Sequence, residues 1–178
     1  MPLSDIVQAS LPAAQEDAKN GELLEVSPAA AQVLDQIKAR FEGNKGRALF
    51  IDYGPAETEF GDSLQALKRH KKVGVFSDPG NTDLTARVDF AAIIDAAQAI
   101  NMPVTHPVEQ REFLSKLGLE MRAMALARAV PESKAKIGRQ LHRLTDQDEM
   151  GALFKAICVQ SDGLDLPLGF KRFAEPKL

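Results

Sequence analysis

A continuous apolar run in the middle of the chain, from Ala48 to Ile51, passes directly into the polar residues Asp52 and Tyr53. Strands buried on both faces of a sheet have such uninterrupted runs, whereas half-buried strands alternate apolar and polar residues. We therefore predict a fully buried strand over residues 47–53. A helical segment precedes it, and this helix-then-strand order favours a sheet built from repeated strand–helix units.

Helix and strand signals alternate along the rest of the chain, which predicts an α/β fold. Ser27 and Pro28 are suited to the start of the first helix, and Gly43 is suited to its end. We predict further helices at residues 89–100, 110–117 and 120–129 and after Ser133. Short strands are predicted at residues 64–67, 72–76, 102–105 and 154–159. The first 20 residues carry little pattern, so we predict a weakly ordered segment at 1–20 and a folded domain at 21–178.

Composition argues against several classes of function. The 178 residues are 44% hydrophobic, enough for a core, and the net charge of −3 is too small to favour nucleic acid or an anionic membrane. No apolar run approaches the roughly 20 residues that span a bilayer. The one cysteine, Cys158, cannot form a disulfide within the chain, and we predict a buried structural residue. The histidines are widely spaced, so we predict no metal site.

Polar residues gather between the short apolar runs that follow residue 47. Asp52 and Tyr53 end the predicted strand, and ligands of open α/β sheets bind beyond the carboxyl ends of strands. Asp78, Asp83 and Asp89 form a carboxylate-rich loop further along. Structural readings stay open for these residues, because an aspartate can start a turn or cap a helix and a tyrosine can pack with its hydroxyl bonded.

Several short segments, taken in their order and spacing, resemble the MidA family, which includes the mitochondrial complex I assembly methyltransferases. The resemblance covers roughly residues 20–160, and it departs from the family pattern where residues 106–109 precede Gln110. Besides residues 47–54, the matching segments are Glu25-Val26-Ser27-Pro28-Ala29-Ala30, Ser63-Leu64-Gln65-Ala66 with His70, Asp78-Pro79-Gly80, Asp83-Leu84-Thr85-Ala86, Val88-Asp89-Phe90, Phe113-Leu114 to Leu117-Gly118, and Met150-Gly151 to Lys155.

This resemblance implies a class I methyltransferase-like fold and S-adenosylmethionine as the cofactor. Such enzymes bind the cofactor at a glycine-rich turn after the first strand of a Rossmann-like sheet, where glycine lets the backbone approach closely. No Gly-x-Gly turn between a strand and a helix occurs in this sequence. We therefore expect the C-terminal half of such a domain, with helical additions, that lacks the N-terminal cofactor-binding half and is inactive by itself.

The resemblance further implies a protein arginine N-methyltransferase with a complex I subunit as its substrate. Carboxylates suit a guanidinium group because they accept its paired N–H donors. A histidine near the site could act as a general base, although the basic residues around it also suit an exposed tip. The catalytic candidates are Asp52, Tyr53 and His70, and the substrate-binding candidates are Asp83, Asp78 and Asp89.

Two other classes of function stay open. One is a non-catalytic interaction module, or a degenerate fragment, that binds a complex I subunit; the exposed edge of a strand at Ala48 to Ile51 would invite pairing with another chain. The other is a different α/β enzyme that acts on small molecules, for which the sequence supplies no nucleophile or metal. The resemblance implies a mitochondrial protein, or a cytoplasmic one if the source is bacterial. A homo-oligomer stays open as a further alternative.

Overall fold

The computed structural model describes residues 18–170, so most of the segment predicted to be weakly ordered lies outside the described residues. At its centre is a three-stranded sheet in the order β1-β6-β5, formed by Arg47–Tyr53, Phe154–Gln160 and Val108–Glu109. Strands β1 and β6 pair along their whole length, from Arg47 opposite Gln160 to Tyr53 opposite Phe154. Two segments more than 100 positions apart in the sequence therefore form the main ladder of the fold.

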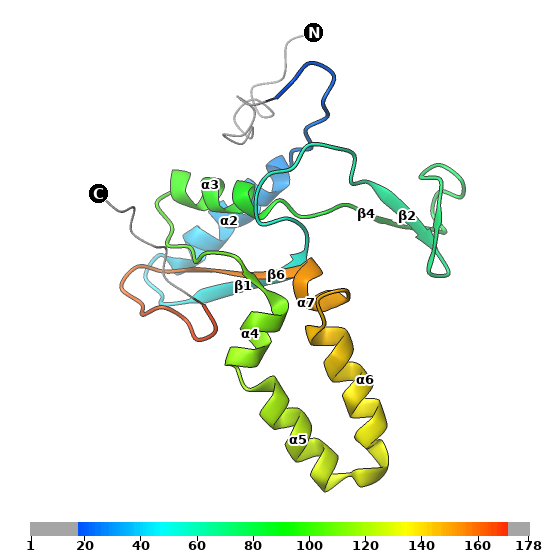
Figure 1. Ribbon diagram of the computed structural model, residues 1–178. Helices are drawn as coiled ribbons and strands as arrows, with labels where there is room; N and C mark the ends of the chain where they lie inside the picture. The colour runs from blue at the N-terminus through cyan, green and yellow to red at the C-terminus, as the bar shows by residue number, and fades with distance from the viewer. Residues whose placement is uncertain (1–17, 171–178) are drawn as a thin grey trace.

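Helices lie on both faces of this sheet (Figure 1). On one face, α2 (Pro28–Phe41) and α3 (Phe90–Ala99) pack over β6 through Leu34, Ala97 and the buried Val159. On the other, α4 (Gln110–Lys116) covers Ala156 and Cys158 with Phe113. Because successive side chains of a strand point to opposite faces, the single strand β6 supplies both cores. The mixed α/β architecture agrees with the predicted class.

Two parts of the chain project from this body (Figure 1). One is a second antiparallel sheet in the order β3-β2-β4, formed by Lys71–Val73, Gln65–Lys68 and Asp83–Thr85. The other is a helical hairpin of α5 (Leu119–Ala129) and α6 (Lys134–Thr145), joined by the 3-10 turn Pro131–Ser133. A short helix, α7 (Met150–Leu153), returns the chain to β6. No helix in the stretch 18–170 is both long and apolar enough to cross a membrane.

The prediction that residues 47–53 form a fully buried strand is wrong in its burial. The strand forms with the predicted bounds, but only Ala48 and Phe50 pack against the helices, while Leu49 and Ile51 are 49% and 42% exposed. Among the described strands, β1 is an edge strand of its sheet, and it pairs with β6 in antiparallel orientation. Repeated strand–helix units give parallel strands, so the expected repeat is not seen at this pair. An apolar run indicates that a strand can be buried on both faces, but its actual burial depends on which elements pack against it.

Candidate functional site

The carboxyl end of β1 is tied to the segment that follows β4. The Tyr53 hydroxyl is hydrogen-bonded to the Thr85 hydroxyl, and the Tyr53 carbonyl accepts a hydrogen bond from the Val88 N–H at 3.0 Å. The Tyr53 ring packs against Phe154 with ring centroids 6.0 Å apart. The Thr85 hydroxyl and the Phe154 ring therefore fix the phenol at the carboxyl end of β1. Ligands of open α/β sheets bind beyond the carboxyl ends of strands.

Gly54 lets the two segments approach each other so closely. A Cβ at this position would lie 2.0 Å from the Val88 carbonyl oxygen, so no side chain fits without moving backbone. The Phe90 N–H also reaches the Pro55 carbonyl across the same crossing, at 3.4 Å. The glycine after the apolar run is thus required by packing at this point.

Asp89 holds the start of α3. One carboxylate oxygen accepts a hydrogen bond from the Ala92 N–H at 3.0 Å, and the other accepts one from the Thr58 hydroxyl at 2.8 Å. The first contact is the N-cap interaction that aspartate commonly makes. Both carboxylate oxygens of Asp89, a substrate-binding candidate, therefore bond to other residues of the fold. These contacts are those expected if Asp89 caps a helix.

Asp83 and Thr85 lie two residues apart on β4, so their side chains point to the same face of the small sheet. Thr85 contacts Tyr53, whereas Asp83 is exposed. Asp52 is also exposed, at the end of β1, and its carboxylate accepts a hydrogen bond from the Tyr53 N–H at 2.8 Å. The structure thus bonds Tyr53 to Thr85, and Asp83 lies two residues from Thr85 on the same face of β4. We call Tyr53, Thr85 and Asp83 the Tyr53 row, and Asp52 precedes Tyr53 in the chain.

The other two candidates lie further out on the small sheet. Asp78 forms an ion pair with Lys68 and accepts a hydrogen bond from Asn81 Nδ2 at 3.0 Å. The Lys68 ammonium, followed by the Asn81 amide, lowers the pKa of the Asp78 carboxyl below its ordinary value. His70 lies in the turn between β2 and β3, with a backbone φ of 62°, and is exposed. Neither residue has a recorded contact with the row that contains Tyr53, and their functional roles stay predictions.

A buried serine near this row was not among the candidates. Ser63 is 4% exposed; its hydroxyl donates to the Glu25 carboxylate and accepts from the Arg87 N–H at 3.0 Å. Arg87 in turn pairs with Glu59 at 2.6 Å. Glu25 and Ser63 both occur in the segments that carry the family resemblance, and that shared occurrence was the available signal. Their 38-residue separation concealed the contact.

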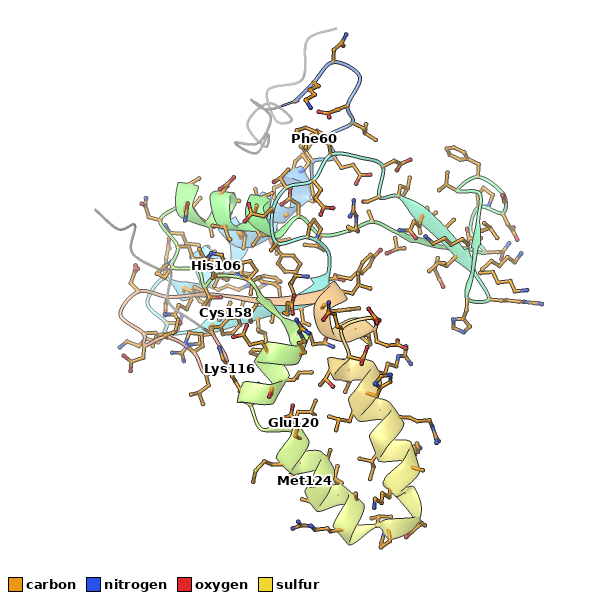
Figure 2. The ribbon with its side chains drawn as sticks, viewed as in Figure 1. Phe60, His106, Lys116, Glu120, Met124 and Cys158 are labelled. Carbon is orange, nitrogen blue, oxygen red and sulfur yellow. The ribbon has the colours of Figure 1, made fainter. Side chains whose placement is uncertain are left out.

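One hollow among the described residues lies away from the Tyr53 row. A hollow of about 400 Å³ opens at the other end of the central sheet, between the end of α2 and residues 101–103 and 160–162. Figure 2 shows Cys158 within the central sheet and Met124 out on the α5 hairpin. Within residues 18–170, no group of three or more His, Cys, Asp and Glu residues is placed to hold a metal ion. Tyr53, Thr85 and Asp83 do not line this hollow.

Comparison with known proteins identifies relatives of the chain. Residues 1–108 match the family described as "Putative S-adenosyl-L-methionine-dependent methyltransferase". The Caenorhabditis elegans "Protein arginine methyltransferase NDUFAF7 homolog, mitochondrial" is 34% identical over 148 residues, and its Rattus norvegicus counterpart is 33% identical over 135 residues. These matches cover 82% and 75% of this chain but 34% and 30% of the relatives, so the chain spans about a third of their length.

Two solved structures from Burkholderia thailandensis are similar in fold. One, of an uncharacterised protein, has a TM-score of 0.71 and 24% identity, and the match covers 95% of this chain and 46% of that one. The other, bound to S-adenosyl-homocysteine, has a TM-score of 0.60 and 29% identity, covering 70% of this chain and 34% of that one. The described fold therefore corresponds to part of a larger methyltransferase-like fold.

Proposed function

This chain belongs to the S-adenosyl-L-methionine-dependent methyltransferase family whose model it matches, and on that premise we propose that it supplies the acceptor side of a protein arginine methyltransferase. The relatives named protein arginine methyltransferases support the reaction, and the neighbour bound to S-adenosyl-homocysteine supports the cofactor. The observation that carries the proposal is the row formed by Tyr53, Thr85 and the exposed Asp83 at the carboxyl end of β1.

The row suits a guanidinium substrate for a simple electrostatic reason. Asp83 is exposed, and an aspartate carboxylate can accept two parallel N–H donors from an arginine. The phenol of Tyr53 is fixed by Thr85, so it can limit where the bound side chain lies. Methyl transfer depends mainly on placing the nucleophilic nitrogen in line with the cofactor's methyl group, and S-adenosylmethionine supplies that methyl when it is bound.

The remaining candidates take supporting parts in the proposal. Asp52 precedes Tyr53 in the chain, its carboxylate accepts from the Tyr53 N–H, and it is our candidate for receiving the proton that the methylated nitrogen loses. Asp78 and Asp89 hold the two ends of the segment 78–89 through their bonds to Lys68 and Thr58 respectively. His70, on an exposed turn, is proposed to contact the protein substrate outside the reacting side chain.

Binding of an arginine peptide to the purified chain tests the acceptor assignment. We expect a fluorescent arginine-containing peptide to bind more tightly than the matched lysine peptide, by fluorescence anisotropy. Asp83→Asn should weaken binding of the arginine peptide by about 10-fold or more, because a bidentate charge-assisted contact contributes roughly 1.5–3 kcal/mol. Glu132→Gln is the matched control, since Glu132 is an exposed acid on the far helical hairpin.

Two results would overturn the acceptor assignment. One is equal affinity for the arginine and lysine peptides, and the other is an equal loss of binding in Asp83→Asn and Glu132→Gln. Calorimetric titration with S-adenosylmethionine is the companion measurement, and we expect no heat of binding from this chain alone. Micromolar binding would mean that the chain carries the cofactor site itself, and the division into acceptor and cofactor parts would be wrong.

The relatives and the family resemblance support our proposals for the protein substrate and the compartment. Those named mitochondrial support a mitochondrial protein, and the resemblance supports a complex I subunit as the methylated substrate. The Burkholderia thailandensis neighbours support a bacterial cytoplasmic protein as the alternative. Mass spectrometry of methylarginine on complex I subunits, compared between cells with and without the gene, distinguishes a complex I substrate from any other.

A further inference from the structure

The hairpin of α5 and α6 carries an excess of positive charge. Its residues 119–145 contain six Lys and Arg residues against two Glu, although the whole chain has a net charge of −3. All six cations are exposed, and none has a recorded ion pair within residues 18–170; the pair at the base of the hairpin joins His142 to Asp146. The overall charge therefore conceals a basic surface on a part that projects from the body (Figure 1). The six cations are Arg122, Arg128, Lys134, Lys136, Arg139 and Arg143.

Three of these cations form one line along α6, which we call the α6 stripe. Lys136, Arg139 and Arg143 are separated by three and then four positions, so they share one face of the helix. At the helical rise per residue, the stripe is about 10 Å long. The apolar residues of α6 lie on another side of the helix and are half-buried; they are Ile137, Leu141 and Leu144.

Lys136 occupies a position where an acid would make the helix more stable. Ser133 precedes α6, and a Glu or Gln three residues later would complete a capping box, but Lys136 has that place. The first turn of α6 contains no acidic residue, and no side chain caps it. Positive charge there opposes the helix dipole. An exposed residue that breaks a local stability rule is expected at a functional position.

The inner end of the α6 stripe is fixed to the acceptor side of the fold. The turn after α6 is bonded to α7 through the Asp146 carbonyl, which accepts from the Gly151 N–H at 3.0 Å. The Leu153 carbonyl at the end of α7 accepts from the Gly54 N–H at 3.3 Å, directly after Tyr53. Helix α6 therefore has a set direction relative to the Tyr53 row and leads away from it toward the hairpin tip (Figure 1).

The kind of partner follows from this line of charge and from its place. Guanidinium and ammonium groups pair with carboxylates. Acids at alternate positions of an extended peptide are about 6–7 Å apart, close to the rise of about 5–6 Å between neighbouring stripe residues. A helix that binds a bilayer surface presents apolar residues beside its cations, and the α6 stripe has none on its face. An acidic polypeptide that also reaches the Tyr53 row is the partner that fits.

We propose that the α6 stripe is a docking site for an acidic segment of the protein substrate, apart from the arginine that is methylated. The proposal rests on the proposed function for the identity of that substrate. The stripe holds the polypeptide while the Tyr53 row holds the arginine, so binding at one place makes binding at the other intramolecular. Substrate choice then depends on an acidic segment as well as on an arginine.

Fluorescence anisotropy with three labelled peptides tests the docking site on the full chain. The first peptide has glutamates alternating with serines and no arginine, the second has one arginine and no acid, and the third joins the two through Gly-Ser linkers of graded length. We expect the acidic peptide to bind at least about tenfold more tightly than its glutamine counterpart, with an affinity that falls as salt is added. At the best linker length, the joined peptide should bind at least about tenfold more tightly than either part.

Two pairs of substitutions, equal in charge, locate the contact. Arg139→Gln with Arg143→Gln should weaken the acidic peptide at least about tenfold and leave the arginine peptide unchanged. Arg122→Gln with Arg128→Gln removes the same charge from α5 of the same hairpin and should leave both peptides unchanged. Asp83→Asn should weaken the arginine peptide alone. Circular dichroism of each variant confirms that it is folded.

Lys136→Glu separates docking from a structural role. The new acid completes the capping box and suits the helix dipole, so the melting temperature should rise by about 1–3 °C. Binding of the acidic peptide should nevertheless weaken at least about tenfold, because a stripe cation becomes an anion. A residue with only a structural role would not move stability and binding in opposite directions.

Four outcomes would overturn the proposal. They are equal binding of the acidic and glutamine peptides, an equal loss in the two arginine pairs, and a joined peptide that binds no more tightly than the acidic one at any linker length. The fourth is stripe-dependent binding to vesicles of phosphatidylglycerol and phosphatidylcholine without binding of the acidic peptide, which would assign the stripe to a membrane. The acidic peptide contains no arginine, so its result is separate from the Asp83→Asn test of the proposed function.

Discussion

Replacing Gly54 by alanine tests the claim that a close backbone crossing holds the Tyr53 row in place. The new Cβ would lie 2.0 Å from the Val88 carbonyl oxygen and 2.9 Å from the Val88 nitrogen. Both are backbone atoms, so the two segments must separate, and the bond from Val88 to the Tyr53 carbonyl is strained or lost. Overpacking costs about 1–3 kcal/mol, and a lost hydrogen bond adds about 1 kcal/mol.

The smaller freedom of alanine in the unfolded chain offsets about 0.4–1 kcal/mol of that loss. We therefore expect the free energy of unfolding of Gly54→Ala to fall by about 2–3 kcal/mol. With a urea m-value of about 2 kcal/mol/M, the midpoint followed by circular dichroism should fall by about 1–1.5 M with no change in slope. Deuterium exchange at the Val88 amide should also become faster.

Gly138→Ala is the matched control. Gly138 lies in the interior of α6, and a Cβ there meets no atom within 4 Å. Alanine is a better helix former than glycine, so this variant should gain about 0.5–1 kcal/mol. The reasoning is refuted if Gly54→Ala unfolds at the same urea concentration as the unaltered chain, or if both variants shift the midpoint in the same direction.

Three further results are expected. Asp89→Ala should lower the free energy of unfolding by about 1 kcal/mol in urea titrations, because α3 loses its N-cap, and Asp89→Asn should retain most of the stability. Lys68→Met should raise the pKa of the Asp78 carboxyl toward its ordinary value in an NMR titration. Since the folded pKa of Asp78 is the lower one, its contribution is present above the unfolded pKa and is lost as the pH falls through the folded pKa. Burial, opposed by Arg47, raises the pKa of the Cys158 thiol, so a thiol reagent at pH 8 should label Cys158 only as fast as the protein unfolds.

Several helix boundaries were predictable because their signals are local. The predicted helix at residues 89–100 is α3, Phe90–Ala99, with Asp89 as its cap, and the start at Pro28 is the start of α2. The stop predicted at Gly118 is also confirmed, with a φ of 82° at that glycine. Caps, glycines and the 3.6-residue period act over a few residues, so they can be read without knowing the rest of the fold.

The strands were less predictable because a strand depends on its partners. The strand predicted at residues 102–105 is only the bridge between Val104 and Val159, while Asp83–Thr85, taken to be part of a loop, is β4. The structure pairs Asp83–Thr85 with Gln65–Lys68, some 18 residues earlier in the chain. A three-residue run is too short for its period to identify a strand, and its pairing partner is not a local property.

The candidate site divides in the same way. The sequence and its family resemblance singled out the polar segments that contain Asp52, Tyr53 and Asp83. The structure bonds Tyr53 to Thr85, which lies two residues from Asp83 on β4. Their catalytic and binding roles stay predictions. The sequence did not reveal that Glu25 bonds Ser63, since the contact links segments 38 positions apart.

The sequence by itself determined the family, the α/β class, most helix limits and the buried character of β6, because each depends on residue type and short-range order. Only the tertiary structure decided which apolar strand is covered. Ala48 to Ile51 is as apolar as the buried run around Cys158, yet β6 lies between two packed faces and β1 ends the described sheet. Burial is a property of neighbours, and the neighbours of β1 are set by contacts that no local pattern records.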